Sequence, residues 1–127
     1  MKASELRIGN LIEFWSVYDT VILINSINED TSYVDTTSYA NVYLNEIKPI
    51  PLTEEWLLKF GFEIIWDSKY LTQYTLQSNM MFHYELDKPK NIWYARFGKY
   101  ELEHIKYVHQ LQNLYFALTG EELTIKE

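Results

Sequence analysis

The first 50 residues contain short apolar runs, one of them rich in β-branched residues, separated by polar turns, a pattern that predicts short β-strands. Turn-forming residues separate the hydrophobic runs, among them Gly9-Asn10 and the polar segment 28–30. The expected strands cover residues 11–15, 20–27, 31–35 and 41–44. Several short strands at a spacing of about ten residues are typical of a small, strongly bent antiparallel sheet or SH3-like barrel.

Residues 53–60 have the composition of a short helix. Thr53 can serve as the N-cap, acidic residues occupy the first turn, and Gly61 can take the left-handed position that ends a helix. Its predicted buried side consists of Trp56, Leu57 and Phe60. Pro49 and Pro51 keep the preceding chain extended.

The pattern of strands returns in 62–105, where polar turns separate five strands at 64–66, 70–76, 80–86, 92–97 and 100–105 and predict an antiparallel meander. In the strand 70–76, alternation places Tyr70, Thr72, Tyr74 and Leu76 on one face. From residue 107 the period changes to 3.6, which predicts an amphipathic helix over 107–118 that packs on the meander. Its apolar stripe comprises Val108, Leu111, Leu114, Tyr115 and Leu118.

The predicted fold is therefore α+β, with an N-terminal SH3-like bent antiparallel sheet, a short helix, an antiparallel β-meander and a C-terminal amphipathic helix. We expect a single domain over 1–127, with one sub-unit at 1–50 and a second at 51–127. The chain has no apolar run of the roughly 18 to 20 residues that a membrane span requires. The sequence thus predicts a soluble, cytoplasmic protein without membrane contact.

Composition removes several classes of chemistry. There is no cysteine, so disulfides, thiolate nucleophiles and cysteine metal sites are excluded. The formal net charge is -7, from 11 Lys and Arg against 18 Asp and Glu, and the acidic excess lies within residues 1–67. Such a charge opposes general binding to a phosphate backbone and favours a basic partner.

No recognised catalytic or nucleotide-binding motif occurs, so we predict neither an enzyme nor a cofactor or metal site. His104 and His109 lie five residues apart, which is not the metal-binding spacing on a helix. The alternative is a metal-dependent enzyme that uses clustered carboxylates. Its candidate residues are Glu101, Glu103 and His104.

Aromatic residues make up 17% of the chain, more than a small core needs, and Tyr and Trp often anchor protein interfaces. Acids in predicted turns with nearby tyrosines form the candidate protein-binding set. These residues are Asp19, Glu29, Asp30, Asp35, Tyr18, Tyr33, Tyr39 and Tyr43. An alternative is direct contact with RNA or single-stranded DNA through a basic and aromatic stretch at 88–106, with Lys88, Lys90, Arg96 and Lys99 as its cations.

Three blocks of sequence resemble a set of small, uncharacterised proteins carried by phages and prophages of Bacteroidota. The blocks are ELRIGNL at 5–11, IKPIPLTEEWLLKFGF at 47–62 and YVHQLQNLYFALTGEEL at 107–123. The resemblance supplies no catalytic residues. It implies an accessory protein in the cytoplasm of a bacterial host that binds host machinery, a group to which anti-CRISPR inhibitors belong. The partner so implied is a basic nucleic-acid-binding host protein such as a CRISPR effector.

Overall fold

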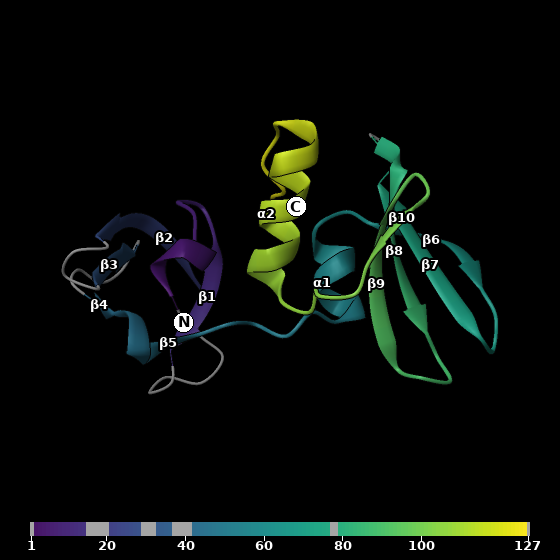
Figure 1. Cartoon of the computed structure of the whole chain (residues 1–127), viewed down its shortest axis with the longest axis horizontal. Helices are drawn as coiled ribbons and strands as arrows, with labels where there is room; N and C mark the ends of the chain where they lie inside the picture. Colours follow the sequence, from purple (N-terminus) through teal and green to yellow (C-terminus); the bar gives the residue numbers. More distant parts are fainter. Residues whose placement is uncertain (1, 15–20, 29–32, 37–41, 77–78, 127) are drawn as a thin grey trace. The chain divides into compact units, whose positions relative to one another are not determined.

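The computed structural model describes residues 2–14, 21–28, 33–36, 42–76 and 79–126, and it is an α+β protein dominated by antiparallel strands (Figure 1). The chain divides into two compact units. The first comprises Met1–Pro51 and Tyr107–Leu123, and the second comprises Leu52–Lys106 and Thr124–Glu127. Within the described part of the chain, no helix is long and apolar enough to cross a bilayer.

The first unit contains a sheet of five antiparallel strands in the order β4-β3-β2-β1-β5. Its strands are β1 Leu11–Phe14, β2 Val21–Asn28, β3 Tyr33–Thr36, β4 Val42–Tyr43 and β5 Ile47–Lys48. Short 3-10 helices are η1 Ala3–Glu5 and η2 Leu44–Glu46, and η2 joins β4 to β5. This order is SH3-like, as the sequence pattern predicts. The fifth strand was not predicted, because two residues carry no readable alternation.

Buried aliphatic side chains from β1, β2, β4 and β5, together with Leu6 from the segment before β1, form the core of this sheet. Leu6, Ile12, Ile24, Val42 and Ile47 make one cluster. Strands β1 and β2 pair with Leu11 opposite Leu23 and Ile12 opposite Ile22. Burial of the clustered aliphatic side chains, Ile12, Ile24 and Ile47 among them, accounts for the stability of such short strands.

Helix α2 Val108–Thr119 belongs to the first unit and contacts β1. This differs from the expected subdivision, which placed 107–118 with the meander. The prediction that Leu118 belongs to the buried stripe is wrong, since 39% of it is exposed. The buried side of α2 instead comprises Val108, His109, Leu111, Gln112 and Tyr115. Gly120, with φ 75°, ends the helix in the left-handed conformation.

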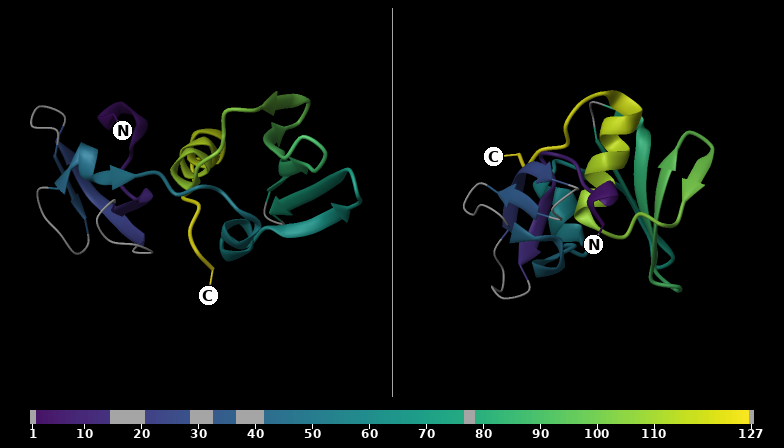
Figure 2. Two further views of the ribbon diagram at one scale, coloured as in Figure 1. Left: turned by 90° about the horizontal axis from the view of Figure 1, so that it is seen from below. Right: turned by 60° about the vertical axis from the view of Figure 1, so that its left-hand side comes forward.

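The second unit begins with helix α1 Glu54–Lys59, whose N-cap Thr53 accepts a hydrogen bond from the backbone N–H of Trp56 at 3.4 Å. Its sheet has the order β10-β9-β8-β7-β6, so each strand pairs with its neighbour in sequence (Figure 1). Two further views of the strands are given in Figure 2. They are β6 Glu63–Asp67, β7 Leu71–Leu76, β8 Asn79–Asp87, β9 Ile92–Phe97 and β10 Tyr100–Leu102.

Aromatic rings fill the core of the second unit. Phe62 lies 6.1 Å from Phe82 between ring centroids, and Tyr84 stacks on Trp93 at 5.1 Å. Tyr74 and Tyr84 are almost fully buried. Tyr70, which the alternation placed on the same face as Tyr74, precedes β7 and is 62% exposed.

Candidate functional site

Most of the acidic and tyrosine residues proposed for protein binding fall outside the described part of the chain. Those residues are Tyr18, Asp19, Glu29, Asp30 and Tyr39. Asp35 accepts a hydrogen bond from the Ser26 hydroxyl at 2.9 Å, so it contributes to the β2–β3 hairpin. Tyr33 and Tyr43 are directly opposite in the β3–β4 pairing, and Tyr43 is exposed.

The four cations proposed for nucleic-acid contact are not equivalent in the structure. Lys88 forms an ion pair with Asp67, with Nζ 2.6 Å from the carboxylate. Arg96 forms ion pairs with Glu85 and with Glu101. Lys90 is exposed, and the Nζ of Lys99 lies 5.6 Å from the ring centroid of Tyr100.

The ion pairs of Arg96 extend across one face of the second sheet. Gln73 in β7 donates a hydrogen bond to Glu85 in β8 at 2.9 Å, and Arg96 in β9 lies 3.1 Å from the same carboxylate. Glu101 in β10 completes the row. Only 4% of Glu85 is exposed, so its carboxylate is largely removed from water. The Arg96 guanidinium compensates for this loss of hydration. Arg96 is therefore a structural cation in this sheet.

Of the residues proposed for metal-dependent catalysis, only Glu101 belongs to this row of charged side chains. Glu101 pairs with Arg96, whereas Glu103 and His104 follow β10 in an exposed turn. Among the described residues, no group of three or more His, Asp or Glu side chains is placed to hold a metal ion.

The most unusual surface of the second unit is strand β6, which forms one edge of the sheet. All five of its residues are exposed. They include three large apolar side chains with exposed fractions of 45% for Ile64, 44% for Ile65 and 58% for Trp66. Exposed apolar side chains grouped on a sheet edge are uncommon in a protein surface and mark interaction sites.

The pairing of β6 with β7 is irregular at the centre of this edge. Ile64 lies opposite Tyr74 and Trp66 lies opposite Gln73, and the register shifts between them. Ile65 therefore has no direct partner on β7. Cross-strand partners share a face of the sheet. Tyr74 and Gln73 are consecutive in β7 and point to opposite faces, so their partners Ile64 and Trp66 also lie on opposite faces. The bulge thus presents apolar side chains on both sides of the edge.

Polar contacts fix the end of β6 and the turn that follows it. Asp67 accepts hydrogen bonds from Lys88 at 2.6 Å and from Thr72 at 2.9 Å, and these lower the pKa of its carboxyl group. The Ser68 hydroxyl accepts hydrogen bonds from the backbone N–H groups of Tyr70 and Leu71, both at 3.2 Å. The edge is thus held in an extended form before any partner binds, which reduces the entropic cost of association.

Sequence reasoning identified the strand but not its exposure. A run such as Ile64-Ile65-Trp66 has the composition of a strand buried on both faces. The predicted meander already places its first strand at an edge of the sheet, but whether other segments cover that edge is not encoded by the local sequence. The run of three large apolar residues between Glu63 and Asp67 is the signal that could have drawn attention to it.

Comparison with known proteins gave no match: no family model, no curated protein and no solved structure matches the chain.

Proposed function

We propose that this chain is a non-enzymatic protein-binding module that engages its partner through the β6 edge of the second sheet. One observation carries the proposal: five consecutive exposed residues on an edge strand, with Ile64, Ile65 and Trp66 among them. A large aromatic side chain on a fixed strand is the kind of anchor that dominates binding energy at protein interfaces.

The mode of binding that this edge supports is strand addition. An extended segment of the partner would hydrogen-bond to the outer backbone groups of β6, and its side chains would pack against Ile64 on one face and Trp66 on the other. Asp67, at the end of the strand, is already paired with Lys88, so the apolar side chains at the centre of β6 set the complementarity. A partner segment with apolar residues at its centre fits this edge.

The partner class follows from charge and from the resemblance to phage-borne proteins. A net charge of -7 favours a basic partner and speeds its association at low salt. A nucleic-acid-binding defence protein of the bacterial host, such as a CRISPR effector, has that chemistry. We therefore propose an anti-CRISPR-like inhibitor that acts by occupying a basic surface. Direct nucleic-acid binding is less favoured, since Lys88 and Arg96 are paired with carboxylates.

The proposal is tested by affinity capture from a lysate of a Bacteroidota host, with the wild-type chain and two single variants as bait. Trp66→Ser removes the anchor from β6. Tyr100→Ser removes an equally exposed ring, 65% against 58%, from β10 at the opposite edge. We expect a captured protein to be lost with Trp66→Ser and kept with Tyr100→Ser. Equal capture by all three baits would contradict binding through β6.

The acids of the N-terminal half need a separate measurement once a purified partner is available. Replacing Glu29 and Asp30 with Lys should slow association if these acids steer the partner, and the effect should diminish at high salt. Neutralising Lys88, Lys90 and Lys99 together, with Arg96 kept because it pairs with the buried Glu85, should abolish binding only if nucleic acid is contacted directly. Unchanged association in the first variant would remove these acids from the proposed interface.

A further inference from the structure

A pocket of about 530 Å³ lies within the second unit and shares no residue with the β6 edge. Its lining comes from two segments, the start of β9 and the chain that follows β10. The residues are Asn91, Ile92, Trp93, Glu103, His104 and Lys106. A pocket of this size has room for an organic ligand or for a side chain of another protein.

The pocket forms where the β9–β10 pairing stops. The described ladder runs from Tyr100 opposite Phe97 to Leu102 opposite Ala95. Glu103 and His104 then form a turn, and the chain leaves the strand that it had followed. The first residues of β9 therefore line a space instead of pairing with β10.

A fixed indole ring forms one wall of the pocket. Trp93 stacks on Tyr84 with 5.1 Å between the ring centroids and 16° between the ring planes. Tyr84 is fully buried, and its hydroxyl donates a hydrogen bond to the backbone carbonyl of Ile105. Trp93 itself is only half-buried, so its ring is held in one plane and still contributes to the lining.

The charge that the pocket offers to a ligand is the carboxylate of Glu103. This side chain is exposed, and it takes part in none of the ion pairs of the described residues. Lys106 also lines the pocket, but it already has an interaction partner in the chain, and we assign no ligand contact to it. A free carboxylate in a chain of net charge -7 favours a cationic ligand.

The shape and hydrogen-bonding groups of the lining favour a planar cation. A guanidinium group stacks on an indole ring, and its five N–H groups are donors only. The Glu103 carboxylate can accept two of these donors in a bidentate pair, and the side-chain oxygen of Asn91 can accept another. Half-buried Ile92 provides apolar surface for a methylene stem. A lysine ammonium is a point charge and lacks the planar fork.

We propose that this pocket binds an arginine side chain of a protein partner, with the guanidinium against Trp93 and paired with Glu103. The pocket is larger than a guanidinium ion, so an arginine within a polypeptide segment fills it better than the ion alone. The inference shares with the proposed function only the basic character of the partner. Its surface is a different one, and either site can exist without the other.

The test is an NMR titration of the full chain with a blocked tripeptide that carries a central arginine, followed through backbone amides and tryptophan indole N–H signals. The same tripeptide with citrulline, the same tripeptide with lysine, and guanidinium chloride at millimolar concentration serve as separate probes. We expect saturable shifts at 91–93 and 103–106, with a Kd of about 1 mM or lower for the arginine peptide. The uncharged citrulline peptide should bind at least roughly tenfold more weakly, and lysine and free guanidinium should also bind more weakly.

Matched variants locate the contacts. Glu103→Gln should weaken binding of the arginine peptide by roughly tenfold, whereas Glu121→Gln, which also removes an exposed carboxylate, should leave it unchanged. Trp93→Leu should weaken binding several-fold, whereas Trp66→Leu at the β6 edge should not. The Glu103 pair keeps the test decisive if loss of the Trp93 ring also loosens the fold.

A further variant tests the sign of the ligand charge. Lys106→Gln removes a cation from the lining, so binding of the arginine peptide should be unchanged or tighter. Weaker binding in this variant would contradict a cationic ligand.

Four other results would overturn the proposal. The first is the absence of saturable shifts in this pocket with the arginine peptide, and the second is unchanged affinity in Glu103→Gln. The third is a citrulline or lysine peptide that binds as tightly as the arginine peptide, which would remove the preference for a guanidinium. The fourth is guanidinium chloride that binds as tightly as the peptide, which would leave a site for a small cation only.

Discussion

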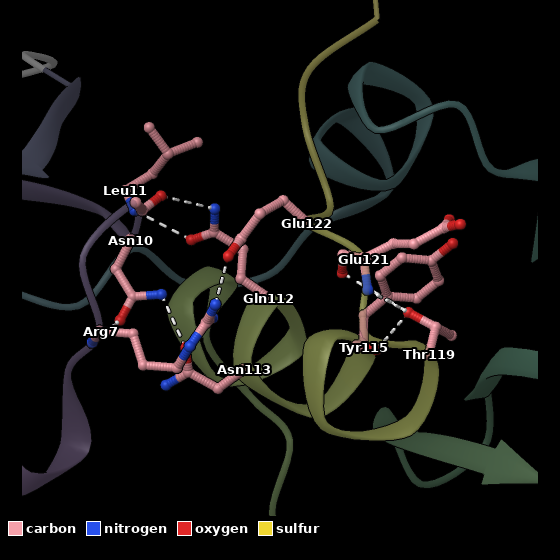
Figure 3. Close-up of polar contacts among 10 residues, drawn as sticks. Arg7, Asn10, Leu11, Gln112, Asn113, Tyr115, Thr119, Glu121 and Glu122 are labelled. Carbon is pink, nitrogen blue, oxygen red and sulfur yellow. Dashed lines mark hydrogen bonds and ion pairs between the residues drawn. The ribbon is translucent and has the colours of Figure 1, made fainter.

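The side-chain amide of Asn10 donates a hydrogen bond to the side-chain oxygen of Asn113 at 2.8 Å, across 103 positions of sequence. Asn113 lies in α2, and its oxygen also accepts from Arg7 at 3.1 Å (Figure 3). Its amide donates to the carbonyl of Glu5 at 3.0 Å. Gln112 adds a second link, because it accepts from the N–H of Leu11 and donates to the carbonyl of Gly9. The first and third sequence blocks thus meet in one polar network.

Loss of the Asn113 side chain should destabilise the first unit. Asn10 is fully buried, so Asn113→Ala leaves its amide without this acceptor. We expect a loss of about 1 to 3 kcal/mol in the free energy of unfolding, measured by chemical denaturation. Asn45→Ala, which removes an exposed amide from η2, is the matched control and should change stability by less than about 0.5 kcal/mol. Equal effects of the two variants would show that the network contributes nothing.

The two ends of the apolar stripe on α2 should respond differently to truncation. Leu111 is fully buried, and Leu111→Ala should cost about 2 to 4 kcal/mol through the cavity that it leaves. Leu118 is 39% exposed, so Leu118→Ala should cost less than about 1 kcal/mol. Denaturation of both variants under the same conditions is the measurement. A loss at Leu118 as large as that at Leu111 would place its side chain in the core.

Local sequence pattern predicted both helices and most strands, because each has a clear hydrophobic period or a capping residue. It failed where burial depends on partners distant in sequence. His109 and Gln112 are buried although both are polar, and Gln112 is satisfied by backbone groups more than 100 positions away. Hydropathy cannot reveal such residues, since the compensating hydrogen bonds exist only in the folded chain.

The candidate sites were less predictable than the fold for a related reason. The predicted meander placed β6 at an edge, but the exposure of its side chains and the space where β10 leaves β9 depend on how the neighbouring segments pack. The basic stretch at 88–106 was visible in the sequence, yet the carboxylates that neutralise Lys88 and Arg96 come from other strands.

Arg96 should matter for folding instead of for nucleic-acid contact. Arg96→Met removes the cation beside Glu85, whose carboxylate is buried, and we expect a loss of about 1 to 3 kcal/mol in unfolding free energy. Lys90→Met removes an exposed cation from the β8–β9 turn and should change stability little. Thermal or chemical unfolding distinguishes them. Unchanged stability of the Arg96→Met variant would contradict a structural role for Arg96 and would support the nucleic-acid contact that the sequence suggested.

The β6 edge should bind another protein in preference to a second copy of itself. An antiparallel pairing of two β6 strands centred on Ile65 places Glu63 opposite Asp67 of the second copy; each Asp67 already pairs with Lys88, but two acidic side chains directly opposite still weaken the pairing. We therefore expect a monomer of 15.3 kDa in sedimentation equilibrium at micromolar concentration. A dimer that Ile64→Lys dissociates would instead assign the edge to self-association.

Stability should fall as the pH drops below about 6.5, because His109 is buried in α2. Burial lowers the pKa of its imidazole from 6.5, against the opposing effect of the Glu5 carboxylate, and within the described residues Nδ1 has no hydrogen-bond partner. Below pH 6.5 the unfolded chain binds a proton at this site that the folded chain excludes, so protonation favours unfolding.

The measurement is the free energy of unfolding between pH 5 and 7, where one such group contributes a slope of at most about 1.4 kcal/mol per pH unit. His109→Gln should reduce this slope, because the substituted side chain does not titrate. His104→Gln, at an exposed position in the turn after β10, is the control and should retain it. Identical slopes for wild type and His109→Gln would mean that the imidazole accepts a proton as readily in the folded chain as in the unfolded one.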